Sequence, residues 1–273
     1  MGRYRMGKSD NPVGVFDSGI GGLTVVKELL RVLPQERFIY FGDTARVPYG
    51  NKSKETIIRF TLENILFLLK QDVKLVVIAC NTSSSIALPL IKQYFRIPIL
   101  GVVIPAVKES VYATRNKRIG IIGTRATIES GTYEREIHRL DPEIKVFAKS
   151  CPLFVPLIEE GWLEGNVVEK VVRDYLAPLK EKEIDTLILA CTHYPLLKKM
   201  IKKFMGKEIL LIDSAREVAI EAKELLNQES LLYAGKRRAS ALACYVTDKS
   251  DIFQEIGSRF LGRRLENIHE IKD

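Results

Sequence analysis

The sequence predicts an α/β protein with two pseudo-symmetric α/β lobes, mainly parallel sheets and an active site in the cleft between the lobes. Short runs of Val, Ile and Leu alternate with amphipathic helical patterns along the chain, as is typical of parallel sheets covered by helices. One pattern also occurs twice, at 73–102 and 184–214: an apolar strand ending in Ala-Cys, then a helix and another strand. This internal repeat predicts two similar halves.

Each element follows from its local pattern. Continuous apolar runs predict buried strands, and apolar residues recurring every three to four positions predict helices. We expect Ser53 to be the N-cap of the second helix. In chain order, the expected elements are a strand at 12–16, a helix at 22–33, a strand at 38–41, a helix at 54–69, a strand at 75–79, a helix at 84–94, strands at 97–102 and 118–122, a helix at 128–140, a strand at 145–148, a helix at 166–179, a strand at 186–190, a helix at 195–205, a strand at 209–212, a helix at 217–226, a strand at 241–246 and a helix at 252–261.

The repeat also predicts the domain boundaries. We expect one lobe to contain residues 1–103 and 215–273, with residues 1–11 as a flexible extension. The other lobe is expected at 104–214, and the C-terminal segment then returns to complete the first lobe.

Composition and charge narrow the class of protein. The chain has 273 residues, 46% hydrophobic and 28% charged, which is typical of a folded globular protein. The net charge of +8 is spread along the chain, so we expect no nucleic-acid partner. No apolar run is long enough for a bilayer and the N-terminus lacks an apolar stretch, so we expect no membrane association and a cytoplasmic location.

Polar and small residues cluster where predicted strands end, which is where open α/β sheets bind ligands. These groups are Asp17 to Gly22, Gly42-Asp43 with Pro48-Tyr49-Gly50, Cys80-Asn81-Thr82, Gly123-Thr124, and Cys191-Thr192-His193. The glycine loop with Asp43 after it could bind a dinucleotide, but the third glycine of that fingerprint and a phosphate-binding lysine are missing. Glycines that let a substrate approach the backbone fit better.

Cys80 and Cys191 occupy equivalent points of the repeat, so symmetric lobes would place both thiols at one cleft. Racemisation needs such a pair, because one base removes the α-proton and a second group returns a proton to the opposite face. A thiol suits acid–base work near neutral pH. Two buried cysteines without chemistry, or a metal site with His193, are the alternatives, although a fourth metal ligand is not apparent.

Further residues at the strand ends would exchange protons with the thiols or bind an anionic substrate. Asp17 and His193 would be proton partners of the two thiols, although a turn cap and a structural histidine are the alternatives. The polar residues where helices begin suit carboxylates; they are Ser18, Asn81, Thr82 and Thr192. No lysine can be recognised as an anchor for a cofactor, so we expect no cofactor. We also expect no metal, because a fourth ligand is not apparent.

At these residues the chain resembles the glutamate racemases of the aspartate/glutamate racemase superfamily, from residue 12 to about 262. The matching motifs are DSGIGG at 17–22, GDTARVPYG at 42–50, ACNTSS at 79–84, GTRATIESGTY at 123–133, CPLFVPLIEEG at 151–161 and ACTHYP at 190–195. Any one of these motifs is weak alone, whereas together they are highly specific.

The resemblance implies cofactor-independent inversion by Cys80, the base for D-glutamate, and Cys191, the base for L-glutamate. Asp17, Glu159 and His193 would assist, with Glu159 chosen over Glu160. The implied glutamate contacts are Asp17, Ser18, Pro48, Tyr49, Gly50, Asn81, Thr82, Thr124, Thr192 and His193.

The resemblance further implies a supply of D-glutamate for bacterial peptidoglycan, and a homodimer. Two other functions stay open. The substrate could be aspartate or another amino acid, although His193 and the PYG loop favour glutamate. Alternatively, the chain could be a two-lobed binding protein that captures a small anion without turnover.

Overall fold

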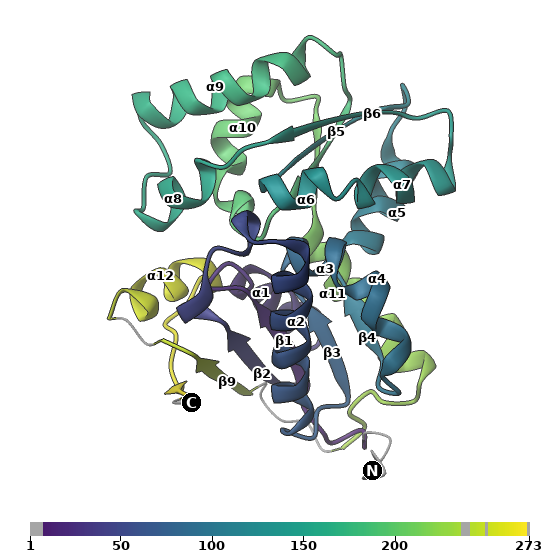
Figure 1. The fold of residues 1–273 in the computed structure, drawn as a ribbon, viewed down its shortest axis with the longest axis vertical. Coiled ribbons are helices and arrows are strands. Elements are labelled where there is room, and N and C mark those ends of the chain that lie inside the picture. Colours follow the sequence, from purple (N-terminus) through teal and green to yellow (C-terminus); the bar gives the residue numbers. More distant parts are fainter. Residues whose placement is uncertain (1–7, 236–240, 249–250, 272–273) are drawn as a thin grey trace.

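The structure is a computed structural model that describes residues 8–235, 241–248 and 251–271. Within these residues the strands form two parallel sheets, each in its own lobe (Figure 1). This agrees with the predicted fold class. The expected flexible extension at 1–11 lies outside the described residues up to residue 7.

The first sheet has the strand order β10-β9-β2-β1-β3-β4, and every neighbouring pair is parallel. Its strands are β1 (Val13–Asp17), β2 (Arg37–Gly42), β3 (Leu75–Ile78), β4 (Ile99–Gly101), β9 (Ala241–Val246) and β10 (Ile268–Glu270). Strand β9 pairs with β2, with Arg37 opposite Ala241. The chain therefore returns to the first sheet at its C-terminal end.

The second sheet has the order β6-β5-β7-β8 and is also parallel. Its strands are β5 (Arg118–Gly123), β6 (Lys145–Ser150), β7 (Thr186–Ala190) and β8 (Leu210–Asp213). Strands β3 and β7 are the first strands of the two copies of the repeat, and each precedes a cysteine in its own sheet.

Helices cover both faces of the first sheet. Strand β1 is buried at every position, and its alternate side chains enter different cores. Val15 packs in the cluster with α1 (Leu23–Val32) and α11 (Ser214–Gln228), and Phe16 packs in the cluster with α2 (Lys54–Leu69). The Ser53 side chain accepts a hydrogen bond from the backbone N–H of Thr56, so the predicted N-cap is confirmed.

The remaining helices are distributed over both lobes (Figure 1). They are α3 (Asn81–Ile86), α4 (Leu88–Ile91), α5 (Val103–Ala113), α6 (Arg125–Glu129), α7 (Thr132–Leu140), α8 (Phe154–Glu159), α9 (Asn166–Lys180), α10 (Lys198–Met205) and α12 (Asp251–Leu261). Short 3₁₀ turns occur at Thr44–Arg46, Tyr49–Asn51, Lys92–Tyr94 and Tyr194–Leu197.

Three predicted helices are wrong as single elements. The helix expected at 84–94 is divided into α3, α4 and a 3₁₀ turn. Because Pro89 has no N–H, it cannot bond the carbonyl of Ser85 four residues back, and that carbonyl accepts from the Thr132 hydroxyl at 2.8 Å instead. The helix expected at 128–140 is broken by Gly131, whose φ of +64° places it in the left-handed region. The helix expected at 195–205 begins as a 3₁₀ turn.

Helices α5 and α8 and strand β10 were not predicted. The apolar start of α5 follows directly on the apolar run of β4, and α8 is short and contains Pro156, so neither presents a clear helical period. The expected boundaries of the lobes, at 103/104 and 214/215, stay a prediction.

A buried ion pair joins distant segments at the far end of the first sheet. The Lys74 ammonium lies 2.6 Å from Glu36 Oε2 and also donates to the carbonyls of Ser9, at 2.6 Å, and Leu231, at 2.8 Å. Both side chains of the pair are almost fully buried. Among the described residues, no helix is both long and apolar enough to cross a membrane.

Candidate active site

A cavity of about 280 Å³ lies between the lobes, beyond the carboxyl ends of β1, β3, β5 and β7. Both lobes contribute side chains to it. Its lining includes these predicted site residues: Ser18, Pro48, Tyr49, Gly50, Cys80, Asn81, Thr82, Thr124, Glu159, Cys191, Thr192 and His193. Asp17 is the one predicted site residue that is not in the lining.

Cys80 follows β3 and is the N-cap of α3. Its sulfur accepts a hydrogen bond from the backbone N–H of Ser83 at 3.5 Å and lies 3.7 Å from Ser18 Oγ. Burial raises the pKa of the Cys80 thiol to about 11, and the negative charge of Asp17 adds to the rise. The Cys80 thiol is therefore difficult to ionise, and its ionisation requires a nearby group that accepts the proton.

Asp17 lies behind the cavity wall at the end of β1. Its Oδ2 accepts a hydrogen bond from the backbone N–H of Gly19 at 3.1 Å, and its Oδ1 has no hydrogen-bond partner in the described part of the chain. Burial raises the pKa of the Asp17 carboxyl, although the charge of His193 and backbone donors oppose the rise. A buried carboxyl with an unpaired oxygen and a raised pKa is suited to exchanging a proton with Cys80.

Cys191 follows β7 in the second sheet and faces an imidazole. Its sulfur lies 3.9 Å from His193 Nδ1, and His193 Nε2 lies 2.9 Å from Glu159 Oε1. Burial alone would lower the pKa of His193, but the hydrogen bonds and charges of Cys191 and Glu159 outweigh it and raise the pKa to about 10. The imidazole is thus held in its charged form between a sulfur and a carboxylate. This geometry selects Glu159 over Glu160 as the neighbour of His193.

Hydroxyl and amide groups from both lobes meet at one wall of the cavity. Thr82 Oγ1 lies 3.1 Å from the hydroxyl oxygens of both Thr124 and Thr127. Tyr133 donates its hydroxyl proton to Asn81 Oδ1 at 2.6 Å, which aims the amide group. Asn81 Nδ2 has no protein partner among the described residues, so it remains a donor for a ligand.

Two glycines allow the lobes to come this close. A Cβ at Gly21 would collide with the side chains of Thr192 and His193, and a Cβ at Gly50 would lie 2.7 Å from Thr124 Cβ. The glycines therefore permit contact between the lobes. The structure also argues against a dinucleotide site. Asp43, the acid that would bind the ribose, is fully buried and bonded to Arg46 and Tyr49.

The structure also bears on the metal alternative. In the described part of the chain, no group of three or more His, Cys, Asp or Glu side chains is placed to hold a metal ion. The cavity carries instead two thiols, each with a different partner.

Several lining residues were missed by sequence reasoning: Val47, Asn51, Arg125, Pro152, Val155, Pro156 and Ala190. Pro152, Val155 and Pro156 fall in the CPLFVPLIEEG motif, from which only Glu159 was taken. Arg125 adds a positive charge to a site expected to bind anions through hydroxyls and helix ends. Phe260 of α12 was missed too, and its ring packs edge-on against His193 at 5.1 Å between centroids.

Comparison with known proteins identifies the family of this chain. The model of a family described as Asp/Glu/Hydantoin racemase matches residues 15–222. The chain belongs to this family of racemases. A glutamate racemase from Geobacter metallireducens is 47% identical over 259 residues, covering 95% of this chain and 96% of the relative.

Solved racemase structures share the fold over almost the full length. Glutamate racemase from Francisella tularensis, crystallised in complex with D-glutamate, has a TM-score of 0.91 and 40% identity, covering 97% of this chain and 98% of that one. The Thermus thermophilus enzyme, in complex with β-chloro-D-alanine, has a TM-score of 0.87 and 43% identity over the same shares of the two chains. The predicted two-lobed α/β fold is confirmed, and the chain is an amino-acid racemase.

Proposed function

We propose that this racemase interconverts L- and D-glutamate without a cofactor, with Cys80 and Cys191 as its two acid–base groups. One observation carries the proposal: the two thiols line the same cavity from different sheets, and each has its own buried proton partner. The relatives named glutamate racemase supply the substrate.

Inversion removes the α-proton from one face of the substrate and adds a proton to the opposite face. In the L-to-D direction, Cys191 as thiolate removes the α-proton, and the Cys80 thiol delivers its proton to the opposite face. The cycle ends with Cys191 protonated and Cys80 as thiolate, which is the starting state for the reverse reaction. His193 and Asp17 reset these states by exchanging protons with the neighbouring sulfurs.

Burial keeps the Cys80 thiol in its neutral form in the free enzyme. The Cys80 thiol, with a pKa of about 11, stays protonated near neutral pH. On the other side, the imidazole of His193 lies 3.9 Å from the sulfur of Cys191. Reaction from D-glutamate therefore requires a prior proton transfer from Cys80 toward Asp17.

Substrate recognition would use neutral donors at both ends of the amino acid. Asn81 Nδ2, the hydroxyls of Ser18, Thr82 and Thr192, and the backbone at Tyr49-Gly50 surround the cavity and suit carboxylates. Arg125 would attract an anionic substrate. Asp17 would act on Cys80 from behind the lining.

The biological setting rests on the resemblance alone. We propose that the product D-glutamate enters bacterial peptidoglycan synthesis, that the enzyme works in the cytoplasm and that it forms a homodimer. The lobes, at 1–103 with 215–273 and at 104–214, would each carry one thiol to the cleft.

The test is incubation of the purified, reduced protein with L-glutamate in heavy water, with a chelator and no added cofactor. We expect loss of optical rotation together with deuterium at the α-carbon. Cys80→Ala and Cys191→Ala should each abolish inversion in both directions, and Cys151→Ala, a buried cysteine outside the cavity lining, is the matched control.

Three results would contradict the proposal. Full activity of Cys80→Ala would rule out the two-thiol mechanism. Faster inversion of aspartate than of glutamate would change the substrate. Tight glutamate binding without any α-proton exchange would favour the binding-protein alternative.

A further inference from the structure

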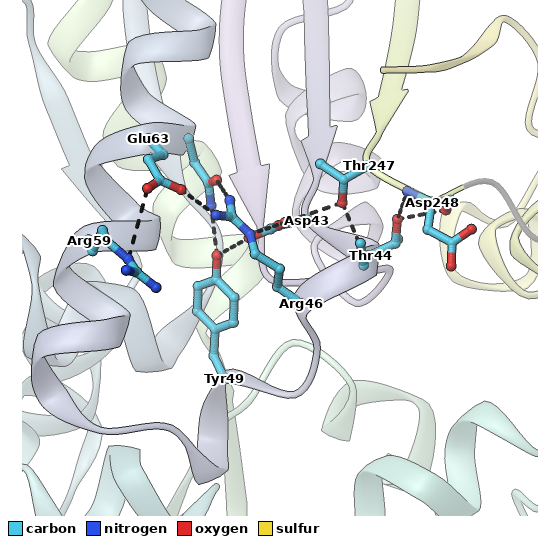
Figure 2. Close-up of polar contacts among 10 residues, drawn as sticks. Asp43, Thr44, Arg46, Tyr49, Arg59, Glu63, Thr247 and Asp248 are labelled. Carbon is cyan, nitrogen blue, oxygen red and sulfur yellow. Dashed lines mark hydrogen bonds and ion pairs between the residues drawn. The ribbon is translucent and has the colours of Figure 1, made fainter. Parts of the chain in front are cut away.

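A network of polar contacts around Asp43 adjoins Tyr49, which belongs to the Pro48–Gly50 wall of the cavity. Figure 2 shows the side chains of this network. At its centre is Asp43, which is fully buried directly after β2. Arg46 Nε lies 2.8 Å and 2.7 Å from the two carboxylate oxygens of Asp43. Asp43 does not line the cavity, so the two-thiol mechanism gives it no role.

Tyr49 connects this network to the cavity. Its hydroxyl donates to Asp43 Oδ2 and accepts from Asn64 Nδ2 at 3.1 Å, so it points away from the cavity into the first lobe. Tyr49 therefore offers a substrate its backbone, while its hydroxyl serves as an anchor. The 3₁₀ turn Tyr49–Asn51 starts at this residue, and the N–H groups that begin such a turn lack partners within it.

Helix α2 holds the network from one side. Arg46 pairs with Glu63 and donates to Asn64 Oδ1 at 3.2 Å, and both of these residues belong to α2. The guanidinium also lies over the ring of Phe60, 4.1 Å from its centroid. A guanidinium engaged on three sides fixes the orientation of the Asp43 carboxylate.

The end of β9 holds the network from the other side, although it lies 204 residues further along the chain. Thr247 Oγ1 donates to Asp43 Oδ1 at 3.2 Å and accepts from the backbone N–H of Ala45 at 3.0 Å. Thr44 and Asp248 exchange two hydrogen bonds at 2.6 Å and 2.8 Å. The segment that leads to Tyr49 is thereby bonded to the residues that directly follow β9.

We infer that Asp43, Arg46 and Thr247 are positioning residues for the substrate. They act through the Tyr49 hydroxyl, and they hold the backbone of Tyr49-Gly50 at the cavity wall. The affinity for the substrate therefore depends on the end of β9, far from the reacting atoms. This inference rests on the proposed function only for the identity of the substrate.

The experiment compares Thr247→Val with the wild-type enzyme in full-length protein. Valine keeps the shape of threonine and removes the hydroxyl. We expect KM for both glutamate enantiomers to rise roughly tenfold, as for the loss of one hydrogen bond to a charged group, with kcat within about twofold. Thr247→Ser keeps the hydroxyl and should restore KM. Thr186→Val is the matched control, because Thr186 is a buried threonine at the start of β7 whose hydroxyl bonds Asp185.

A double-mutant cycle with Tyr49→Phe tests the route of the effect. If Thr247 acts through the Tyr49 hydroxyl, Thr247→Val adds little to the KM of Tyr49→Phe. Unchanged KM in Thr247→Val, additive effects in the cycle, or an equal KM rise in Thr186→Val would each overturn the inference.

Hydrogen–deuterium exchange separates this inference from the proposed function, because it needs no substrate. Thr247→Val should speed backbone exchange at 44–51 and leave exchange at 186–190 unchanged. If the wild type fails to racemise glutamate but the loop exchange rises in the variant, the proposed function fails and the anchoring stands. Unchanged exchange at 44–51 would overturn the anchoring whatever the substrate.

Discussion

Replacing Asp17 by asparagine separates two effects that its carboxylate has on Cys80. The amide keeps the size of the side chain and an acceptor for the Gly19 N–H, and it removes the negative charge. Burial and the charge of Asp17 together raise the pKa of Cys80 to about 11. Asp17→Asn should therefore lower the pKa of the thiol, which stays above its ordinary value because the burial remains.

The magnitudes follow from this pKa. At about pH 8, a thiol with a pKa near 11 is ionised in roughly one molecule in a thousand, and each unit by which the pKa falls gives about tenfold more thiolate. A positioned proton acceptor contributes on the order of 10²–10⁴ to the rate. We therefore expect Asp17→Asn to have more Cys80 thiolate but roughly a hundredfold lower kcat from D-glutamate.

Two assays check these opposite expectations. The alkylation rate of Cys80 by iodoacetamide against pH, followed by peptide mass spectrometry, reports thiolate formation. Polarimetry from D-glutamate reports turnover. If turnover rises together with the thiolate, Asp17 only opposes ionisation and is no proton partner. If the alkylation profile is unchanged, the electrostatic reasoning about Cys80 is wrong.

Three further predictions concern stability and binding. The pKa of His193 is about 10 in the folded protein, against an ordinary value of 6.5. The charged imidazole therefore stabilises the folded state fully below about pH 6.5, and this stabilisation is lost as the pH rises through 10. In urea unfolding, the free energies of unfolding of His193→Gln and the wild type should differ most near pH 6 and least above pH 10. Lys74→Met leaves Glu36 buried without its cation and should cost about 3–5 kcal/mol of unfolding free energy, whereas a replacement of both by apolar residues should recover much of it. Gly50→Ala places a Cβ 2.7 Å from Thr124 Cβ, so calorimetry should show weaker glutamate binding, and an unchanged affinity would contradict the close packing there.

Much of the fold was predictable because buried parallel strands are continuous apolar runs. The strands at 186–190 and 241–246 and the helix at 54–69 match the structure at both ends. The breaks near Pro89 and Gly131 were less predictable, since a helical period continues across both residues. Helix α5 was missed because its apolar first turn cannot be told from the end of a strand.

The candidate site was predictable where chemistry follows a strand end, as it does for Cys80 and Cys191. The sequence does not indicate whether a side chain lines the cavity or lies behind its wall. Asp17 lies behind the cavity wall, and Asp43 is bonded to Thr247, a residue that no local pattern connects with it. Such contacts arise from the packing of the two sheets and the return of the chain.

The pairing of β9 with β2 has a consequence for how the protein is made. The second sheet uses only residues from 118 to 213, so it can form before the ribosome has released the C-terminal segment. Until β9 is synthesised, β2 is an edge strand with unpaired backbone groups, and such edges can pair with strands of other chains. We therefore expect nascent or truncated chains that end before residue 241 to aggregate through this edge, and expression of the enzyme to depend on chaperones that bind chains during synthesis.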